Sequence, residues 1–276
     1  MKTIRRGDRG STVKRCQELL NAHGFDTGTP DGIFGRGTEA AAEKFQAAQS
    51  LDADGIVGKA TWAALERKTI WDEKPAPTPL PPALVHLQSL GHDVVWTGDY
   101  HLNLFGIRSP TEEANAFDDI LGCAYTVNKL WKVHYWPGTT DPGTYHLKNP
   151  SRVEGTAVLM PGQYKNTWKI DLHGGKYTAL CQRAGAVTVA RDHTLDNIVD
   201  VDASTKMTGF YGINLHRSSA SGESTRVDRW SAGCQVHART AGFEDMMTLA
   251  RLQVDKLGLD TFTYTLMDQW WGTGDK

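Results

Sequence analysis

Two short stretches of nearly identical sequence decide how the first part of this chain folds: Asp-Gly-Ile-Phe-Gly at 31–35 and Asp-Gly-Ile-Val-Gly at 54–58. Asp-Gly favours a tight turn, because glycine reaches left-handed backbone conformations without a steric penalty. In each stretch we expect one apolar residue after the turn to point into a core. The repeated turns therefore predict a compact unit in which two similar loops separate successive helices.

Three amphipathic stretches surround these turns. The first helix is expected between Ser11 and Gly24, and the second from Thr38, a residue type that often caps a helix. The third is expected over 59–67 around Trp62 and Leu65. In the first two, the apolar residues share one helical face: Val13, Cys16, Leu19 and Leu20, then Ala41, Ala42, Phe45 and Ala48.

Length and composition limit the classes of protein that the chain can form. It has 276 residues, of which 39% are hydrophobic and 22% charged, so it can bury a core and should hold two domains. Thirty Lys and Arg against 32 Asp and Glu give a net charge of -2, which argues against a general nucleic-acid binder. No apolar run is long enough for a membrane span, and no secretory signal is readable at the start.

A proline-rich segment, DEKPAPTPLPP at 72–82, predicts the boundary between the domains. Such a segment forms a stiff, extended spacer. We expect a first domain over 1–70, a linker over 71–83 and a second domain over 84–276. The predicted fold class is a small all-α three-helix domain followed by a mainly β domain with a C-terminal helix.

The second part has short alternating runs rich in Trp, Tyr, Thr and Val, which favour β-strands. One amphipathic helix is expected over 242–257, ending at Gly258. The expected strands are Lys132 to Trp136, Thr144 to Leu147, Trp168 to Leu172, Val187 to Arg191, Phe210 to His216 and Phe262 to Met267.

Two stretches carry the residue types of a thiol nucleophile and its base, GINLHR at 212–217 and WSAGCQV at 230–236. Cys234 follows a Ser-Ala-Gly turn that can expose its sulfur, and His216 ends an alternating strand. A free thiol is only a few per cent thiolate at neutral pH, so a catalytic cysteine needs a neighbouring imidazole or positive potential. The other three cysteines are expected to be buried and reduced, because their wide spacing fits neither a disulfide framework nor a metal motif.

The first part resembles the small helical peptidoglycan-binding domain found at the ends of many cell-wall enzymes. The resemblance covers about residues 3–67 and rests on the repeated D-G-I-x-G turns together with the sequence GRGTEAAAEKFQ at 35–46. It implies binding to the bacterial wall. The alternative is a module retained only for packing, since most of these signature residues are scaffold.

The second part resembles the L,D-transpeptidase catalytic domain over about 125–240, in which a strand-borne His precedes an S-H-G-C sequence. Here His216 and Cys234 are eighteen positions apart, and Asp-Pro-Gly-Thr-Tyr at 141–145 is similar to the family's upstream strand entry. The sequence departs from the family at three positions: Ala232 replaces the second His, Arg217 follows the first His, and Val236 stands where an Arg is usual.

This resemblance implies a mechanism. Cys234 would attack a carbonyl, and His216 would take its proton and return it to the leaving amine. The backbone N–H groups of Gly233 and Cys234 would stabilise the oxyanion, while Ser231 would steady the turn. The implied bond follows the L-centre of the third stem-peptide residue, and an amine or water would then resolve the thioester.

Several further residues are candidates for substrate binding: Arg217, Arg229, His173, His237 and Tyr164. The arginines, with Arg226, could grip a substrate carboxylate, or they could form a solvated basic loop. The histidines, with His193, could line the pocket or have surface or core roles.

We therefore expect an endolysin of the phage type, a cysteine peptidase that cuts peptidoglycan stem peptides. It would need no metal or other cofactor, act as a monomer, bind no nucleic acid, insert in no membrane and stay in the host cytoplasm until release. The alternatives are an L,D-transpeptidase that forms cross-links, and a non-catalytic wall-binding or virion structural protein. A zinc hydrolase is disfavoured because no H-E-x-x-H or comparable compact ligand spacing is present.

Overall fold

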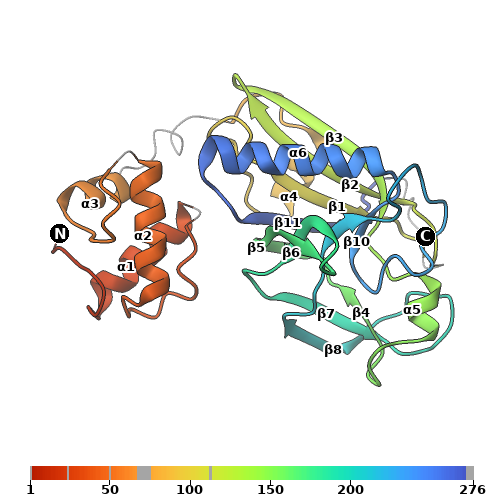
Figure 1. The fold of residues 1–276 in the computed structure, drawn as a ribbon. Coiled ribbons are helices and arrows are strands. Elements are labelled where there is room, and N and C mark those ends of the chain that lie inside the picture. Colours follow the sequence, from red (N-terminus) through yellow and green to blue (C-terminus); the bar gives the residue numbers. More distant parts are fainter. Residues whose placement is uncertain (1, 24, 50, 67–75, 112–113, 272–276) are drawn as a thin grey trace. The chain divides into compact units, whose positions relative to one another are not determined.

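The computed structural model describes residues 2–23, 25–49, 51–66, 76–111 and 114–271. The chain divides into two compact units, one made mainly of residues up to Ala76 and the other mainly of residues from Pro77 (Figure 1). The expected fold class is confirmed: a small helical unit is followed by a mainly β unit whose long helix comes near the end of the chain. Within the described residues, no helix combines the length and apolar character needed to cross a membrane.

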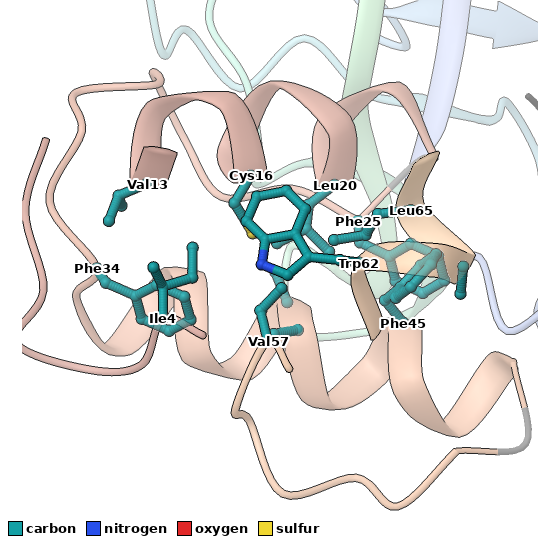
Figure 2. Packing of buried hydrophobic residues seen from close by; sticks show 13 residues of the cluster. Ile4, Val13, Cys16, Leu20, Phe25, Phe34, Phe45, Val57, Trp62 and Leu65 are labelled. Carbon is teal, nitrogen blue, oxygen red and sulfur yellow. The ribbon is translucent and has the colours of Figure 1, made fainter. Parts of the chain in front are cut away.

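The helical unit contains α1 (Ser11–Ala22), α2 (Arg36–Ala48) and α3 (Lys59–Glu66). Their apolar faces meet around the indole of Trp62, which lies close to Cys16 and Val57 (Figure 2). The indole N–H donates to the carbonyl of Lys2 at 2.9 Å, so this large side chain leaves no buried donor unpaired. As expected, Cys16 is buried, and burial raises the pKa of its thiol to about 12.

The first repeated turn is held by a buried glutamine that the pattern of apolar residues did not reveal. Gln17 Nε2 donates to the carboxylate of Asp31, the carbonyl of Ile33 and the hydroxyl of Thr38, and its Oε1 accepts the N–H of Gly32. Thr38 is therefore an acceptor inside the unit. It is not the N-cap that we expected, because α2 begins two residues earlier and Gly35 is its N-cap.

The second repeated turn is held in the same way. Gln46 Nε2 donates to Asp54, to the carbonyl of Ile56 and to Thr61, and its Oε1 accepts the N–H of Gly55. In both turns the fourth residue is the one that enters the core, since Phe34 and Val57 are buried. The repeat in the sequence is thus a repeat of hydrogen bonding as well as of packing.

The β unit is built on a closed eight-stranded barrel with the order β1-β11-β5-β6-β9-β10-β3-β2. Its strands are β1 (Asn103–Arg108), β2 (Asp119–Val127), β3 (Leu130–Thr139), β5 (Gly162–His173), β6 (Tyr177–Gln182), β9 (Leu215–Arg217), β10 (Gln235–His237) and β11 (Phe262–Asp268). A separate three-stranded sheet has the order β4-β7-β8, with β4 (Thr156–Leu159), β7 (Val187–Asp192) and β8 (Asp202–Gly209).

Three helices accompany these sheets: α4 (Pro82–Ser89), α5 (Thr144–Lys148) and α6 (Thr240–Leu257). The long helix α6 lies along one side of the barrel (Figure 1). Its Gly242 packs directly on Trp136 of β3, where an added Cβ would approach the indole to 2.6 Å. Gly258 follows α6 with a positive φ of 69°, as expected for a helix end.

Most of the expected strands are present, but two expectations need correction. Residues 144–147 belong to the helix α5 rather than to a strand, and this helix buries Leu147. The strand expected over 210–216 is reduced to its last residues, because Gln182 Oε1 accepts the N–H groups of Tyr211, Gly212 and Ile213 in place of a strand partner.

The linker expected over 71–83 lies partly outside the described residues. Its described part has no regular structure until Pro82, which is the first residue of α4. Proline is well tolerated at this position, because the first N–H groups of a helix have no partner within the helix. The carbonyl of Pro77 accepts the indole N–H of Trp131 at 2.7 Å. The domain limits drawn from the sequence remain predictions.

Replacing Gln46 by alanine should destabilise the helical unit by about 2 to 3 kcal/mol, because the N–H of Gly55 and the carbonyl of Ile56 lose a buried partner. The exposed Gln49, at the end of α2, provides the matched control, and its alanine variant should change stability by less than about 0.5 kcal/mol. Hydrogen exchange of the α1 and α2 amides in the full chain measures both values. Equal values for the two variants would contradict the role given to Gln46.

Candidate active site

Two three-residue strands bring the two predicted catalytic segments together. Strands β9 and β10 pair in parallel, with His216 opposite Val236. Cys234 comes immediately before β10 and Asn214 immediately before β9, and the N–H of Asn214 points at Cys234 Sγ at 3.4 Å. Cys234 and His216 therefore lie at the same part of the barrel wall although they are eighteen positions apart in the chain.

Cys234 is partly exposed as a residue, although its thiol is largely enclosed, whereas the other three cysteines are buried. Its Sγ also lies 3.5 Å from the carbonyl oxygen of Gly212, which can accept the thiol proton. Burial raises the pKa of Cys234 to about 11, and the N–H of Asn214 opposes this only in part. Cys234 is therefore a protonated thiol at neutral pH in the resting protein.

The ring of His216 is buried and its orientation is fixed by main chain. Its Nδ1 lies 2.8 Å from the carbonyl oxygen of Arg217, and a carbonyl only accepts, so Nδ1 carries the proton. Burial first, and then the neighbouring His173, lower the pKa of His216 to about 3. At neutral pH the ring is thus neutral, with Nε2 unprotonated and able to accept a proton.

His173 lies directly against this ring, so the structure brings one of the expected pocket residues to the site. The two imidazoles are stacked with centroids 4.1 Å apart and planes inclined by 22°. The side-chain amide of Asn214 lies 3.1 Å from His173 Nδ1. Two stacked imidazolium ions would repel each other strongly, so the arrangement favours neutral rings.

Arg217 does not face a substrate as expected. Its guanidinium lies over the ring of Tyr177 at 4.3 Å from the centroid, and Nη1 donates to the carbonyl of Ser219. The hydroxyl of Tyr177 in turn donates to the carbonyl of Arg217, the same oxygen that accepts from His216. Arg217 and Tyr177 thus brace the carbonyl that orients the histidine.

The turn before Cys234 is closed by Ser231, whose Oγ donates to the carbonyl of Cys234 at 2.8 Å and accepts the N–H of Gly233 at 3.1 Å. Gly233 has a φ of 113°, and an added Cβ would lie 2.2 Å from the carbonyl oxygen of Ala157, so no other residue fits. The expected use of the Gly233 N–H as an oxyanion donor is wrong for this state, because Ser231 takes it. Within the described residues, the N–H of Cys234 has no acceptor and stays a candidate donor.

A buried glutamine supports this turn from inside the barrel. Gln235 Nε2 donates to the carbonyls of Thr140 and Gly233, and its Oε1 accepts the hydroxyl of Tyr264 at 2.7 Å. Tyr264 reaches it only because β1 has a glycine at 106, where a Cβ would collide with the phenol oxygen. The position of Cys234 therefore depends on side chains from β10 and β11 as well as on its own turn.

Two predicted substrate-binding residues are structural. His237 is buried, its Nε2 lies 3.3 Å from Met246 Sδ, and burial lowers its pKa to about 3. The hydroxyl of Tyr164 donates to the carbonyls of Met160 and Thr188, so it joins β5 to the three-stranded sheet. His237 Nδ1 has no hydrogen-bond partner, but it is buried and does not face solvent.

The remaining candidates lie on the surface. Arg226 and His193 are exposed, and the guanidinium of Arg229 lies over the ring of Tyr145 at 3.8 Å. In the described parts of the chain, no three His, Cys, Asp or Glu side chains are grouped as metal ligands. The sequence did not reveal the roles of Asn214 and Tyr177; only Asn214 left a signal, as a polar residue two positions before His216, just ahead of β9.

Residues 9–65 match the family described as "Putative peptidoglycan binding domain". A spore cortex-lytic enzyme of Bacillus cereus is 40% identical over 73 residues, which cover 26% of this chain and 28% of that protein. The chain thus spans about a quarter of the length of this curated relative. The sequence resemblance of the first part to peptidoglycan-binding domains is confirmed.

Two solved structures were also found to be similar. The endolysin of Burkholderia AP3 phage is 43% identical over 24% of this chain and 25% of that chain, with a TM-score of 0.24. An L,D-transpeptidase from Xylanimonas cellulosilytica is 17% identical over 96% of this chain and 98% of that chain, with a TM-score of 0.25.

The raised pKa of Cys234 predicts how fast the thiol reacts with iodoacetamide. Because only the thiolate reacts, the rate should rise about tenfold per pH unit from pH 7 to pH 10, without a plateau. Mass spectrometry of the peptide that contains Cys234 measures the rate, and Cys234→Ala removes the signal from that site. A plateau below pH 8 would show that the thiolate is stabilised in the resting protein.

The contact between Gln235 and Tyr264 predicts non-additive stability effects. Gln235→Met leaves the buried phenol without an acceptor and should cost about 1 to 3 kcal/mol. The double variant Gln235→Met/Tyr264→Phe should cost less than the sum of the two single variants, because it leaves no hydroxyl unpaired. Urea unfolding of the four proteins measures the coupling, and strict additivity would show that the two side chains do not interact.

Proposed function

We propose that this protein is a peptidoglycan-degrading enzyme in which Cys234 attacks the stem peptide and the helical unit binds the wall. The observation that carries the proposal is that the β9–β10 pairing brings Cys234, a partly exposed residue, to the same part of the barrel wall as His216, whose Nδ1 is committed to a main-chain carbonyl. The peptidoglycan-binding family matched by residues 9–65 supports the wall as the partner.

The steps follow from the protonation states. As Cys234 Sγ attacks the peptide carbonyl, its proton passes to His216 Nε2 and a C–S bond forms. The resulting oxyanion is stabilised by the N–H of Cys234. The C–N bond then breaks as His216 returns the proton to the leaving amine, and a thioester remains on Cys234.

Water completes the reaction: His216 takes a proton from water as its oxygen attacks the thioester carbonyl, the C–S bond breaks to release the peptide acid, and the proton returns from His216 to the sulfur of Cys234. In the resting state the thiol is directed at the carbonyl of Gly212, and no hydrogen bond joins it to His216. The proposal therefore requires bound substrate to redirect the thiol toward the ring, as happens in sites whose catalytic contacts tighten only in the complex.

Hydrolysis is preferred to cross-linking because the sequence matched in the first part also occurs in proteins named as a spore cortex-lytic enzyme and a phage endolysin. The scissile bond that we propose follows the L-centre of the third stem residue. If an amine acceptor replaced water, the same thioester would form a cross-link, which is the L,D-transpeptidase reaction. The sequence around Cys234 resembles that family.

Incubation of purified sacculi with the full chain tests the proposal. The wild type should release shortened, uncross-linked stem peptides, while Cys234→Ala should release none and His216→Ala should be slower by a factor of about 10² to 10⁴. Soluble products are identified by mass, with and without a chelator, which should have no effect.

Two outcomes would overturn the thiol mechanism: full activity of Cys234→Ala, or loss of wild-type activity on chelation alone. New cross-links or amino-acid-exchanged stems in place of shortened ones would assign the transpeptidase reaction. Exposed Lys132, on β3, supplies the matched control, and its alanine variant should retain wild-type activity.

A further inference from the structure

An open hollow lies beside the turn that carries Cys234. It is lined by Tyr145 and Lys148 of α5 and by the segment from Asp228 to Trp230. The same two segments hold the catalytic turn, because the N–H of Gly143 donates to the carbonyl of Ser231 at 2.9 Å. Gly143 also lies so close to Asp228 that a Cβ there would be 2.3 Å from the Asp228 carbonyl oxygen.

The side chains of this hollow combine two aromatic surfaces with two cations. Tyr145 and Trp230 are 36% and 44% exposed, so both rings can contact a ligand in the hollow. The guanidinium of Arg229 rests on the Tyr145 ring at 3.8 Å, which limits its freedom before any ligand binds. Its carbonyl lies 3.3 Å from His146 Nε2, so the main chain here is also held.

The charges in the hollow are not balanced by the protein itself. Within the described part of the chain, neither Lys148 nor Arg229 forms an ion pair. The only acid of the lining, Asp228, has its carboxylate committed to the side-chain amide of Asn115 at 2.8 Å. The neutral amide does not cancel the charge of Asp228, so the lining carries two cations and one anion and has an excess of one positive charge.

We infer that this hollow binds a free carboxylate of the peptidoglycan stem peptide and so positions the chain for attack by Cys234. The inference rests on the proposed function for the identity of the ligand. A guanidinium supplies paired donors to a carboxylate, a lysine adds a point charge, and the exposed rings cover the apolar parts of the peptide. A shallow, open hollow suits an extended polymer segment better than a small enclosed ligand.

The test compares soluble stem peptides that carry free carboxylates with the same peptides in amidated form. All proteins carry Cys234→Ala, so binding is measured without cleavage. The parent should bind the free acid about tenfold more tightly than the amide, and Lys148→Gln/Arg229→Gln should bind both forms equally, at the affinity that the parent has for the amide. The indole N–H signal of Trp230, assigned with Trp230→Phe, reports occupancy of this hollow rather than of the helical unit.

The control is Arg226→Gln, which removes an exposed arginine from the same loop outside the hollow and should keep the tenfold preference. The inference would be wrong if Lys148→Gln/Arg229→Gln still bound the free acid more tightly than the amide, or if the Trp230 signal did not change when the free acid was added. If the Cys234→Ala parent prefers the free acid but the wild type releases nothing from sacculi, carboxylate binding by the hollow is supported and the proposed reaction is wrong. If the wild type cleaves sacculi and the double variant still prefers the free acid, the proposed reaction is supported and carboxylate binding by the hollow is wrong.

Discussion

The parallel pairing of β9 with β10 is the constraint on which the candidate site depends. Each strand has only three residues, so neither would be stable alone, and each is held by an outer neighbour. Leu180 of β6 pairs with Leu215, and Thr139 of β3 pairs with Val236. The closed barrel therefore fixes the register between the cysteine and the histidine, and the loop between them folds back through bonds such as Ser218 N–H to the carbonyl of His237.

Burial, and not a nearby charge, sets the chemistry of this site. A carbonyl rather than a carboxylate orients His216; this hydrogen bond raises the pKa of the ring, but burial outweighs it, and the resulting pKa of about 3 makes His216 a weak base that is unprotonated at neutral pH. The thiol is a weak acid for the same reason. A stable thiolate–imidazolium pair is disfavoured in such a setting, so proton transfer must accompany formation of the C–S bond.

The sequence predicted the parts of the fold that depend on local patterns. Apolar spacing located the three small helices, α6 and most strands, and the Asp-Gly turns predicted one core residue in each repeat, which the structure shows to be Phe34 and Val57. It failed where a distant side chain replaces regular pairing, as Gln182 does for the segment before His216. The sequence could not show that Ser231 accepts the Gly233 N–H, because this contact depends on the geometry of the turn. It also could not show that His237 contacts Met246, or that Tyr177 donates to the carbonyl beside His216, because these contacts join different elements of the fold.

A neutral thiol and a neutral imidazole have a further consequence for substrate capture. Such a pair exerts no long-range attraction on an anionic polymer, and a chain with a net charge of -2 adds none. Attraction must then come from local cations without acidic partners, which is the arrangement of Lys148 and Arg229 in the hollow beside the turn. The cations of the hollow lie on α5 and in the segment that leads to the cysteine turn, and not on β9 or β10. The departures from the S-H-G-C pattern around Cys234 are compatible with the inferred division, in which a neighbouring surface and not the residues that flank the nucleophile would recognise the substrate.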